Sequence, residues 1–442
     1  MLKNVHTNKN LMHDPYLQAR LGLGIRFMTS SKRVQDRSHK KRVQDLEIVT
    51  EKLKILSKFL LLFEVLKQEP ENVIQVRNLE QYRRQINLPK PHRMSEFLAK
   101  SPKLFELYKD QRGTLWCGLT RAAENLIEEE EEIIAKNSDK AAEHVTRMLM
   151  MAVDKRLALD KIVHYRRDFG LPLDFRIGWV HNYPELFKVV KPFTPYDEGE
   201  YLELALWRPE WAITELEKKQ MGINDEYSCK DHAPGLLSLS FPMKFPRDYK
   251  KVYRYGGKIE HFQKMEYLSP YADGKELKAG SREFDKRAVA IMHELLSFTI
   301  EKRLVTDHLT HFRREFVMPQ KLMRLLLKHI GIFYVSERGK RFSVFLNEAY
   351  EGTELIEKHP LVMWKEKVQN LVGYRGKKRR FGTSEDLQDE DDRDLFGSES
   401  DDDNGTVETE GEEDCMSELE GTASLEDDSE MEIDEIHMAY KD

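Results

Sequence analysis

A pattern of eleven residues that occurs three times constrains the fold of this chain more than any other sequence feature. An aliphatic residue is followed three positions later by an aromatic residue, then by two arginines, and a proline stands seven positions beyond the aromatic residue. The copies are LEQYRRQINLP (79–89), IVHYRRDFGLP (162–172) and LTHFRREFVMP (309–319). Positions three apart share one face of a helix, and a proline ends a helix and suits the first turn of the next. Each copy therefore predicts a helix, a turn and a second helix.

The sequence after each proline also follows one plan. A phenylalanine stands 16, 15 and 14 residues after the three prolines, where it opens or lies in a short apolar run, and a turn and a second apolar run follow. Two such runs around a turn are typical of a β-hairpin. We expect three winged-helix-like units of helix-turn-helix plus hairpin, at about 79–119, 159–206 and 309–346. The predicted fold class is mainly α with short β-hairpins.

Helical spacers and an irregular segment surround these units, which we call unit 1, unit 2 and unit 3. Apolar periodicity predicts helices at 46–67, at 122–152 as one helix, at 281–305 and at 348–372. Residues 207–280 are richer in proline and glycine, and we expect them to be irregular. The folded body is predicted to span 41–372.

The net charge of −7 conceals a basic body and an acidic end. Residues 385–442 contain 26 acidic and two basic side chains, so the first 384 residues carry a net charge of +17. A segment of this composition cannot bury a core, and we expect 384–442 to be a disordered acidic tail. A basic body indicates a polyanionic partner, most often nucleic acid.

The first 44 residues resemble a targeting segment. They hold ten lysines and arginines and only two acids, with several hydroxyl residues. This composition predicts an organelle transit peptide over residues 1–30, although a basic arm that touches nucleic acid would have the same composition. The absence of a long leader rich in serine and alanine favours the mitochondrion, with the chloroplast as the alternative. The apolar stretch 55–66 is too short for a membrane span, and three scattered cysteines form no disulfide framework or zinc set.

Several segments resemble the plant organelle RNA recognition domain family. They include EQYRRQINLPKPHRMSEFLAKSPKLFELYKD, LDKIVHYRRDFGLPLDFRIGWVHNYPELFKVV and HIGIFYVSERGKRFSVFLNEAY, and the resemblance extends over about 41–350. It implies an RNA-binding protein of plant mitochondria or plastids that promotes splicing of group II introns. Intron-containing organellar RNA would be its partner, together with other splicing factors. The acidic tail is a departure from many members, and the family supplies no catalytic residue.

Basic side chains at matching positions of the three units are the candidate RNA contacts. Arginine binds phosphates through two hydrogen bonds and stacks on bases. The alternative is that one arginine of each pair bridges to a carboxylate inside its own unit. The candidates in the repeated pattern are Arg83, Arg84, Arg166, Arg167, Arg313 and Arg314. Those in the second helices are Lys90, Arg93, Lys100, Lys103, Arg176, Lys321 and Arg324. Those at the hairpin tips are Arg112, Arg338, Lys340 and Arg341.

The sequence offers little support for an enzyme. It has no phosphate-binding glycine loop and no nucleophile with a recognisable base, and we predict no catalytic residue, metal or cofactor. His308 and His311 have helical spacing but lack a third ligand. The aromatic residues Tyr82, Tyr165 and Phe312 stand where helical spacing predicts core.

The alternative function is a scaffold that binds nucleic acid and recruits partners through its acidic tail, in the nucleus or a plastid. The basic run at 375–380 would suit a nuclear import signal, but the leader and the family resemblance favour an organelle.

Overall fold

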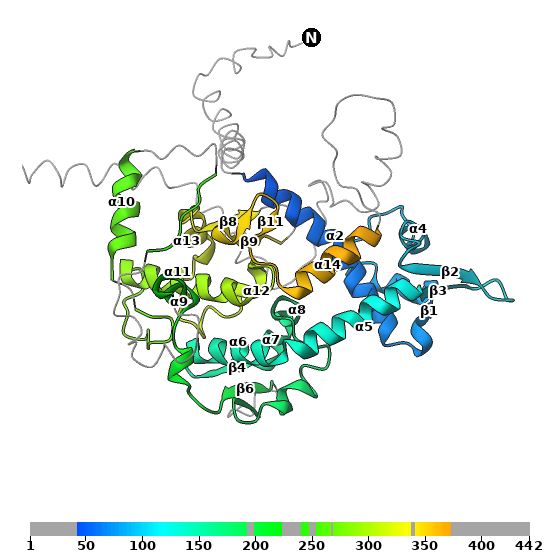
Figure 1. Cartoon of the computed structure of the whole chain (residues 1–442), viewed down its shortest axis with the longest axis horizontal. Coiled ribbons are helices and arrows are strands. Elements are labelled where there is room, and N and C mark those ends of the chain that lie inside the picture. Colours follow the sequence, from blue (N-terminus) through cyan, green and yellow to red (C-terminus); the bar gives the residue numbers. More distant parts are fainter. Residues whose placement is uncertain are drawn as a thin grey trace, which may run out of the picture. The chain divides into compact units, whose positions relative to one another are not determined.

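The computed structural model describes residues 42–191, 199–222, 240–246, 253–266, 268–336 and 341–372 (Figure 1). Apart from Arg42 and Pro246, these residues belong to one compact unit. The predicted transit peptide at 1–30, the basic run at 375–380 and the acidic tail at 384–442 lie outside the described residues, so the expectations for them stay predictions.

Three small antiparallel sheets have the same strand order. In each, the chain enters along an edge strand and later returns as a hairpin whose second strand is central, in the orders β1-β3-β2, β4-β6-β5 and β7-β9-β8. The strands are β1 (Val73–Gln75), β2 (Phe105–Lys109), β3 (Leu115–Leu119), β4 (Arg156–Ala158), β5 (Phe187–Val190), β6 (Tyr201–Leu204), β7 (Arg303–Val305), β8 (Phe333–Ser336) and β9 (Ser343–Leu346). Sequence analysis did not predict the entering strands, because a strand of three residues is too short to show the alternation of apolar and polar residues.

A long helix precedes each sheet, and shorter helices join the entering strand to the hairpin. The long helices are α2 (Gln44–Lys67), α6 (Ser138–Met151) and α11 (Arg282–Phe298). The shorter ones are α3 (Val76–Leu79) and α4 (Met94–Ala99) in unit 1, α7 (Leu159–His164) and α8 (Arg166–Phe169) in unit 2, and α12 (Thr306–Thr310) and α13 (Leu322–Lys328) in unit 3. The prediction of a mainly helical fold with short hairpins is confirmed.

Four helix predictions were wrong in detail. The helix expected at 281–305 ends at Phe298, and its last three residues form β7. Of the segment expected as a helix at 348–372, only Pro360–Val372 is α-helical, because two short strands at 350–351 and 354–355 precede it. The segment expected as one helix at 122–152 is two helices, α5 (Arg121–Lys136) and α6, which meet at Asn137. The Asn137 side chain donates a 2.7 Å hydrogen bond to the carbonyl of Ile133 and thereby competes with the helical backbone bonds. In unit 2 the expected second helix is only a 3-10 turn, Trp179–Asn182, because Gly178 and Pro184 leave too few helix-forming residues in a row.

Left-handed residues mark equivalent places in the three units. Asn87, Gly170 and Val317 have φ of 47°, 68° and 52°, and each stands two residues before the repeated proline. Each residue ends the first helical segment of its unit, as a C-terminal capping residue does. A second set of residues with positive φ stands directly before the entering strands, namely Asn72, Lys155 and Lys302. The repeat therefore extends to backbone conformations that the sequence pattern does not display.

Three hydrophobic clusters hold these elements together. Units 2 and 3 share one cluster, in which the rings of Tyr165 and Phe312 lie 5.1 Å apart. Unit 1 has its own cluster, which the end of α2, α5 and the C-terminal helix α14 (Pro360–Val372) complete (Figure 1). A small third cluster joins the start of α2 to the unit 3 hairpin and to the strands β10 (Tyr350–Glu351) and β11 (Glu354–Leu355). Helix α2 thus contacts both ends of the repeat array.

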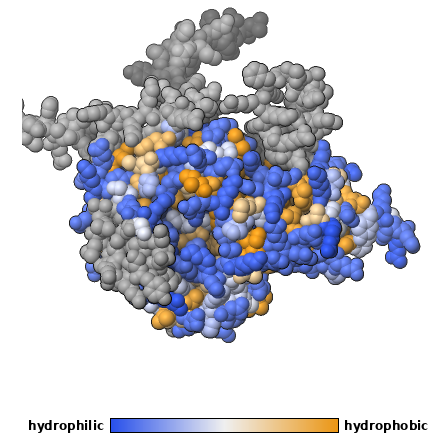
Figure 2. All heavy atoms as spheres, in the orientation of Figure 1, coloured by the Kyte–Doolittle hydropathy of each residue, from blue (hydrophilic) through white to orange (hydrophobic). Residues whose placement is uncertain are grey.

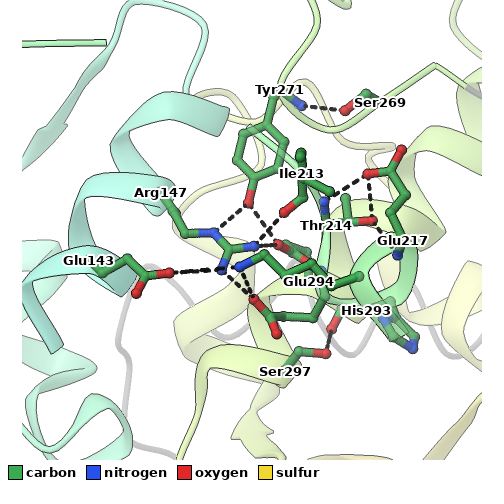
Figure 3. Close-up of polar contacts among 12 residues, drawn as sticks. Glu143, Arg147, Ile213, Thr214, Glu217, Ser269, Tyr271, His293, Glu294 and Ser297 are labelled. Atoms are coloured by element: carbon green, nitrogen blue, oxygen red, sulfur yellow. Dashed lines mark hydrogen bonds and ion pairs between the residues drawn. The ribbon is translucent and has the colours of Figure 1, made fainter. Parts of the chain in front are cut away.

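The segment between units 2 and 3 is attached through a buried arginine. It contains α9 (Glu215–Met221) and α10 (Tyr253–Lys264), so the expectation of an irregular segment holds only in part. The fully buried Arg147 on α6 donates to the hydroxyl of Tyr271 at 3.0 Å, to the carbonyl of Ile213 at 2.7 Å and to Glu294 of α11 at 2.5 Å (Figure 3). A buried charge is tolerated only when its hydrogen-bonding groups have partners, and here these three partners come from three different segments.

Candidate nucleic-acid interface

The arginine pairs stand where the first helical segment of each unit ends. The amide of Leu88 donates to the carbonyl of Arg83, and the amide of Asn87 donates to that of Arg84. Unit 3 has the same bonds from Met318 to Arg313 and from Val317 to Arg314. Basic side chains near a helix C-terminus interact favourably with the helix dipole. This gives the repeated arginines a structural reason to recur, independent of RNA.

In units 1 and 3 the two arginines of a pair differ in environment. Arg83 donates to the carbonyl of Pro89 at 3.0 Å and to that of His92 at 2.5 Å, and Arg313 donates to the carbonyl of Gln320. Arg84 and Arg314 are exposed, and neither has a side-chain partner among the described residues. The first arginine thus fastens the turn around the proline, and the second is available to solvent.

In unit 2 both arginines bind one carboxylate. Arg167 contacts Glu64 of α2 at 2.6 and 2.9 Å, and Arg166 forms an ion pair with the same side chain. Burial alone would raise the pKa of the Glu64 carboxyl, but the two arginines together hold it below its ordinary value. The predicted alternative was a carboxylate within the same unit, whereas Glu64 lies about a hundred residues away in the helix that leads into unit 1.

The basic residues around the second helices differ in the same way. Lys90, Arg93, Lys100 and Lys103 of unit 1 are exposed, as is Lys321 of unit 3, whereas Arg324 is half-buried. In unit 2, Arg176 contacts Asp160 at 2.6 Å and Glu200 at 3.4 Å. Arg176 is exposed as well, but it differs from the exposed cations of units 1 and 3 because two carboxylates of its own unit neutralise it.

The hairpin of unit 1 presents further polar groups. Arg112 is exposed at its tip, where its backbone amide donates to Asp110 at 2.8 Å. The tip of this hairpin is hydrophilic over the face that Figure 2 shows. In unit 3, Arg341 is 68% exposed although it contacts Asp307 at 3.0 Å, and Arg338 and Lys340 lie outside the described residues.

Sequence reasoning missed Tyr108 and Lys109, two exposed residues on the outer strand of the unit 1 hairpin. An exposed aromatic ring beside cations suits stacking on an unpaired base. The alternation of inward-facing and outward-facing residues along the strand could have indicated these two residues. A strand of only five residues shows this alternation weakly. The aromatic residues of the repeat serve another purpose, since Tyr165 and Phe312 are buried and Tyr82 packs against the unit 1 cluster.

Histidines gather between units 2 and 3 without forming a metal centre. The ring of His164 lies 5.6 Å from that of His308 and 6.1 Å from that of His311. Burial, with the neighbouring His164, lowers the pKa of His308 to about 4. Within the described ranges no three histidine, cysteine or acidic side chains are placed to hold a metal ion, and no helix there is long and apolar enough to span a membrane.

With this geometry in place, comparison with known proteins decides the family. Residues 41–377 match the model of the plant organelle RNA recognition domain. The chain belongs to this family. The resemblance drawn from the repeats is thereby confirmed, and it indicates a function related to organellar RNA.

Two relatives in the plant organelle RNA recognition family carry chloroplastic names. The chain is 37% identical over 342 residues to Protein WHAT'S THIS FACTOR 1 homolog, chloroplastic, of Arabidopsis thaliana, an alignment that covers 76% of this chain and 63% of that protein. It is 36% identical over 386 residues to Protein WHAT'S THIS FACTOR 1, chloroplastic, of Zea mays, covering 84% and 75%. The chain thus spans less than two thirds of the Arabidopsis relative.

A third relative carries a mitochondrial name. The chain is 27% identical over 311 residues to Protein WHAT'S THIS FACTOR 9, mitochondrial, of Arabidopsis thaliana, covering 69% of this chain and 76% of that protein. No solved structure matches the chain significantly.

Within this plant organelle RNA recognition domain, the three units differ sharply in charge. Residues 45–372 hold 54 basic and 50 acidic side chains, so the body without its leader and its basic run is close to neutral. Counted from each entering strand to the end of the hairpin, unit 1 (73–119) carries +5, unit 2 (156–206) −1 and unit 3 (303–346) +6. The positive charge of the domain is therefore local to two of its three units.

Proposed function

We propose that the chain is a non-enzymatic RNA-binding protein of a plant organelle, which binds intron RNA and promotes group II intron splicing. Family membership supports the RNA class, and the names of its relatives support an organelle. The observation that best supports this function is the set of exposed cations on matching elements of units 1 and 3. Phosphate contacts of this kind supply most of the affinity for a nucleic acid.

We further propose that each unit is a winged helix. The order of long helix, entering strand, two helical segments and hairpin supports this assignment, as does the central position of the last strand. In such a unit the second helix and the hairpin tip offer adjacent surfaces to a nucleic acid. Lys90, Arg93 and Arg112 of unit 1 would then contact one stretch of RNA.

The proposed mechanism uses binding energy alone. Cationic side chains offset the repulsion between phosphates that a folded intron brings together, and contacts to unpaired bases select the site. The RNA itself would carry out both transesterification steps. The protein would stabilise the folded intron without exchanging a proton or forming a bond.

A comparison of charge-matched variants tests this function. Arg84, Lys90 and Arg93 of unit 1 are replaced together by glutamine, and the control replaces Arg176, Lys188 and Arg156 of unit 2. The unit 1 variant should bind RNA more weakly, with a salt dependence shallower by about 0.7 log units per lost contact on single strands. The control should bind as the parent does. Equal losses in both variants, at equal thermal stability, would contradict the assignment to unit 1.

The compartment and the target need a separate experiment. The composition of the leader favours the mitochondrion, whereas the names of two more similar relatives favour the chloroplast. A C-terminal fluorescent fusion of the intact chain would locate the protein. Sequencing of co-purified RNA would then identify the transcript, and enrichment of RNA without introns would argue against a splicing role.

A further inference from the structure

The last described residue of the chain, Val372, packs against the core of unit 1. Val372, the last residue of α14, is buried in the unit 1 cluster, and its carbonyl accepts a 3.0 Å hydrogen bond from the hydroxyl of Ser101. Ser101 is itself fully buried and follows Lys100 directly, and Lys103 stands two residues further on. Whatever follows Val372 therefore starts beside the exposed lysines of unit 1.

The segment that starts there has the opposite charge to this surface. From Glu385 to Asp442 the net charge is −24, whereas unit 1 carries +5. The thirteen steps from Val372 to Glu385 span at most about 45 Å. Helix α4, which lies between Arg93 and Lys100, has six residues and is about 9 Å long. The acidic residues can therefore reach every cation around α4.

We propose that the acidic tail, residues 384–442, docks on the cationic surface of unit 1 formed by Arg84, Lys90, Arg93, Lys100 and Lys103. Because the proposed function assigns this same surface to RNA, the tail acts there as an intramolecular competitor of RNA phosphates. The inference rests on the proposed function for its consequence, although the docking itself does not require RNA.

Because the tail is tethered to unit 1, it competes more strongly with non-specific RNA than with the true target. A linked ligand acts at a local concentration that reaches the millimolar range for short connections, so even weak pairing is populated. Non-specific RNA binding depends almost wholly on charge, whereas binding of the true target adds base contacts. The tail therefore weakens non-specific binding more than specific binding. The effect must fade with salt, since the Debye length falls from about 30 Å at 0.01 M to about 3 Å at 1 M.

Cross-linking of the full chain tests the docking without RNA. Cys415 lies within the tail, and a Cys229→Ser variant leaves Cys117 as the other thiol. Cys117 is fully buried, and burial raises the pKa of its thiol to about 12, so it reacts slowly. A linker that joins thiols to amines is attached at Cys415, and the linked lysines are identified by mass spectrometry at about 0.01 M and 1 M salt.

We expect links to Lys90, Lys100 and Lys103 at low salt, and their loss at high salt. A matched variant changes Asp401, Asp402, Asp403, Glu412, Glu413 and Asp414 to their amides and should lose the same links. Links confined to Lys377 and Lys378, or spread evenly over Lys188 and other lysines of unit 2, would overturn the proposal. So would links that persist unchanged at 1 M salt.

RNA binding then separates the two proposals. Removal of residues 384–442 should strengthen binding of arbitrary RNA several-fold at low salt, and binding of the co-purified target less. Specific links without RNA affinity in the full or truncated chain would refute the proposed function and leave the docking intact. RNA affinity without such links, and equal for both chains, would refute the docking alone.

Discussion

Arg83 and Arg313 fasten the same turn in two units, while their neighbours Arg84 and Arg314 face solvent. Arg166 and Arg167 share Glu64 and so join unit 2 to α2. Identical dipeptides therefore stand in two different electrostatic settings, one shared by units 1 and 3 and the other found in unit 2. In unit 2 a contact with a distant element, rather than the local pattern, engages both arginines.

The difference between exposed arginines and ion-paired arginines predicts different effects of alanine substitutions. Arg84→Ala and Arg314→Ala should reduce RNA affinity and leave the free energy of unfolding unchanged within about 0.5 kcal/mol, as exposed positions do. Arg166→Ala should instead lower the free energy of unfolding by about 1–3 kcal/mol, because it removes a partner from the half-buried Glu64. Urea unfolding and RNA titration of the same preparations measure both quantities. A stability loss in Arg84→Ala equal to that in Arg166→Ala would contradict this difference.

A second buried carboxylate predicts the response to acid. Burial would raise the pKa of Glu301, but Lys365, at 2.6 Å, and Arg303, at 3.2 Å, lower it to about 2. Because the folded pKa lies below the unfolded value, the ionised carboxylate stabilises the fold above about pH 4.5, and this contribution disappears as the pH falls towards 2. The difference of about 2.5 units corresponds to roughly 3 kcal/mol.

The variant Glu301→Gln isolates this contribution from other acidic groups. The difference in unfolding free energy between the parent and the variant should shrink steadily between about pH 5 and pH 3. A difference that stays constant over this range would show that Glu301 does not carry the predicted charge.

At the scale of single elements, the sequence predicted helices and hairpins wherever the apolar pattern was long enough. It failed where the decisive feature was a single residue, or a pairing partner far away in the sequence. Asn137 breaks a helix through one side-chain bond, and Gly178 helps to reduce the second helix of unit 2 to one turn. The entering strands have only three residues each, and their pairing partners lie some 40 residues away. No local pattern encodes such a partner.

The left-handed turns offer a test at this scale. Val317 is a β-branched residue at φ 52°, a conformation that costs such a side chain roughly 1–2 kcal/mol. Val317→Gly should therefore raise the free energy of unfolding by up to about 1 kcal/mol. At the equivalent Gly170, an added Cβ would meet Ile300 and Leu361 at 3.0 Å, so Gly170→Ala should lower it by about 1–3 kcal/mol. Thermal unfolding of both variants measures the effects, and changes of the same sign would contradict the equivalence of the two turns.

At the scale of the molecule, the sequence located the basic residues but not their partners. Asp160 and Glu200 neutralise Arg176 from two different segments of unit 2, and Glu64 reaches unit 2 from α2. These pairings arise only when the units pack. The difference between a cationic unit 1 and a neutral unit 2 was countable from sequence once the entering strands defined where each unit begins.

Another prediction at this scale concerns the N-terminal leader, residues 1–30. Deletion of residues 1–30 should leave the protein in the cytosol or nucleus, because the basic, acid-poor composition of these residues is that of an import signal. Fluorescence microscopy of the full-length and shortened fusions gives the readout. Unchanged organelle import of the shortened chain would contradict the prediction and would favour the basic-arm interpretation of these residues.

The position of α14 has a consequence for the order in which the protein matures. Trp364, Val368 and Val372 fill the core of unit 1, although they are synthesised some 250 residues after its hairpin. Unit 1 emerges first from the ribosome, yet its core stays incomplete until α14, the last helix of the described residues, has been synthesised. If the chain is imported into an organelle, as proposed above, this delay helps it to pass a translocation pore, since unit 1 cannot close tightly while the rest is still being made. Helix α14 thus closes unit 1, whose core is complete only after residues 360–372 have been synthesised.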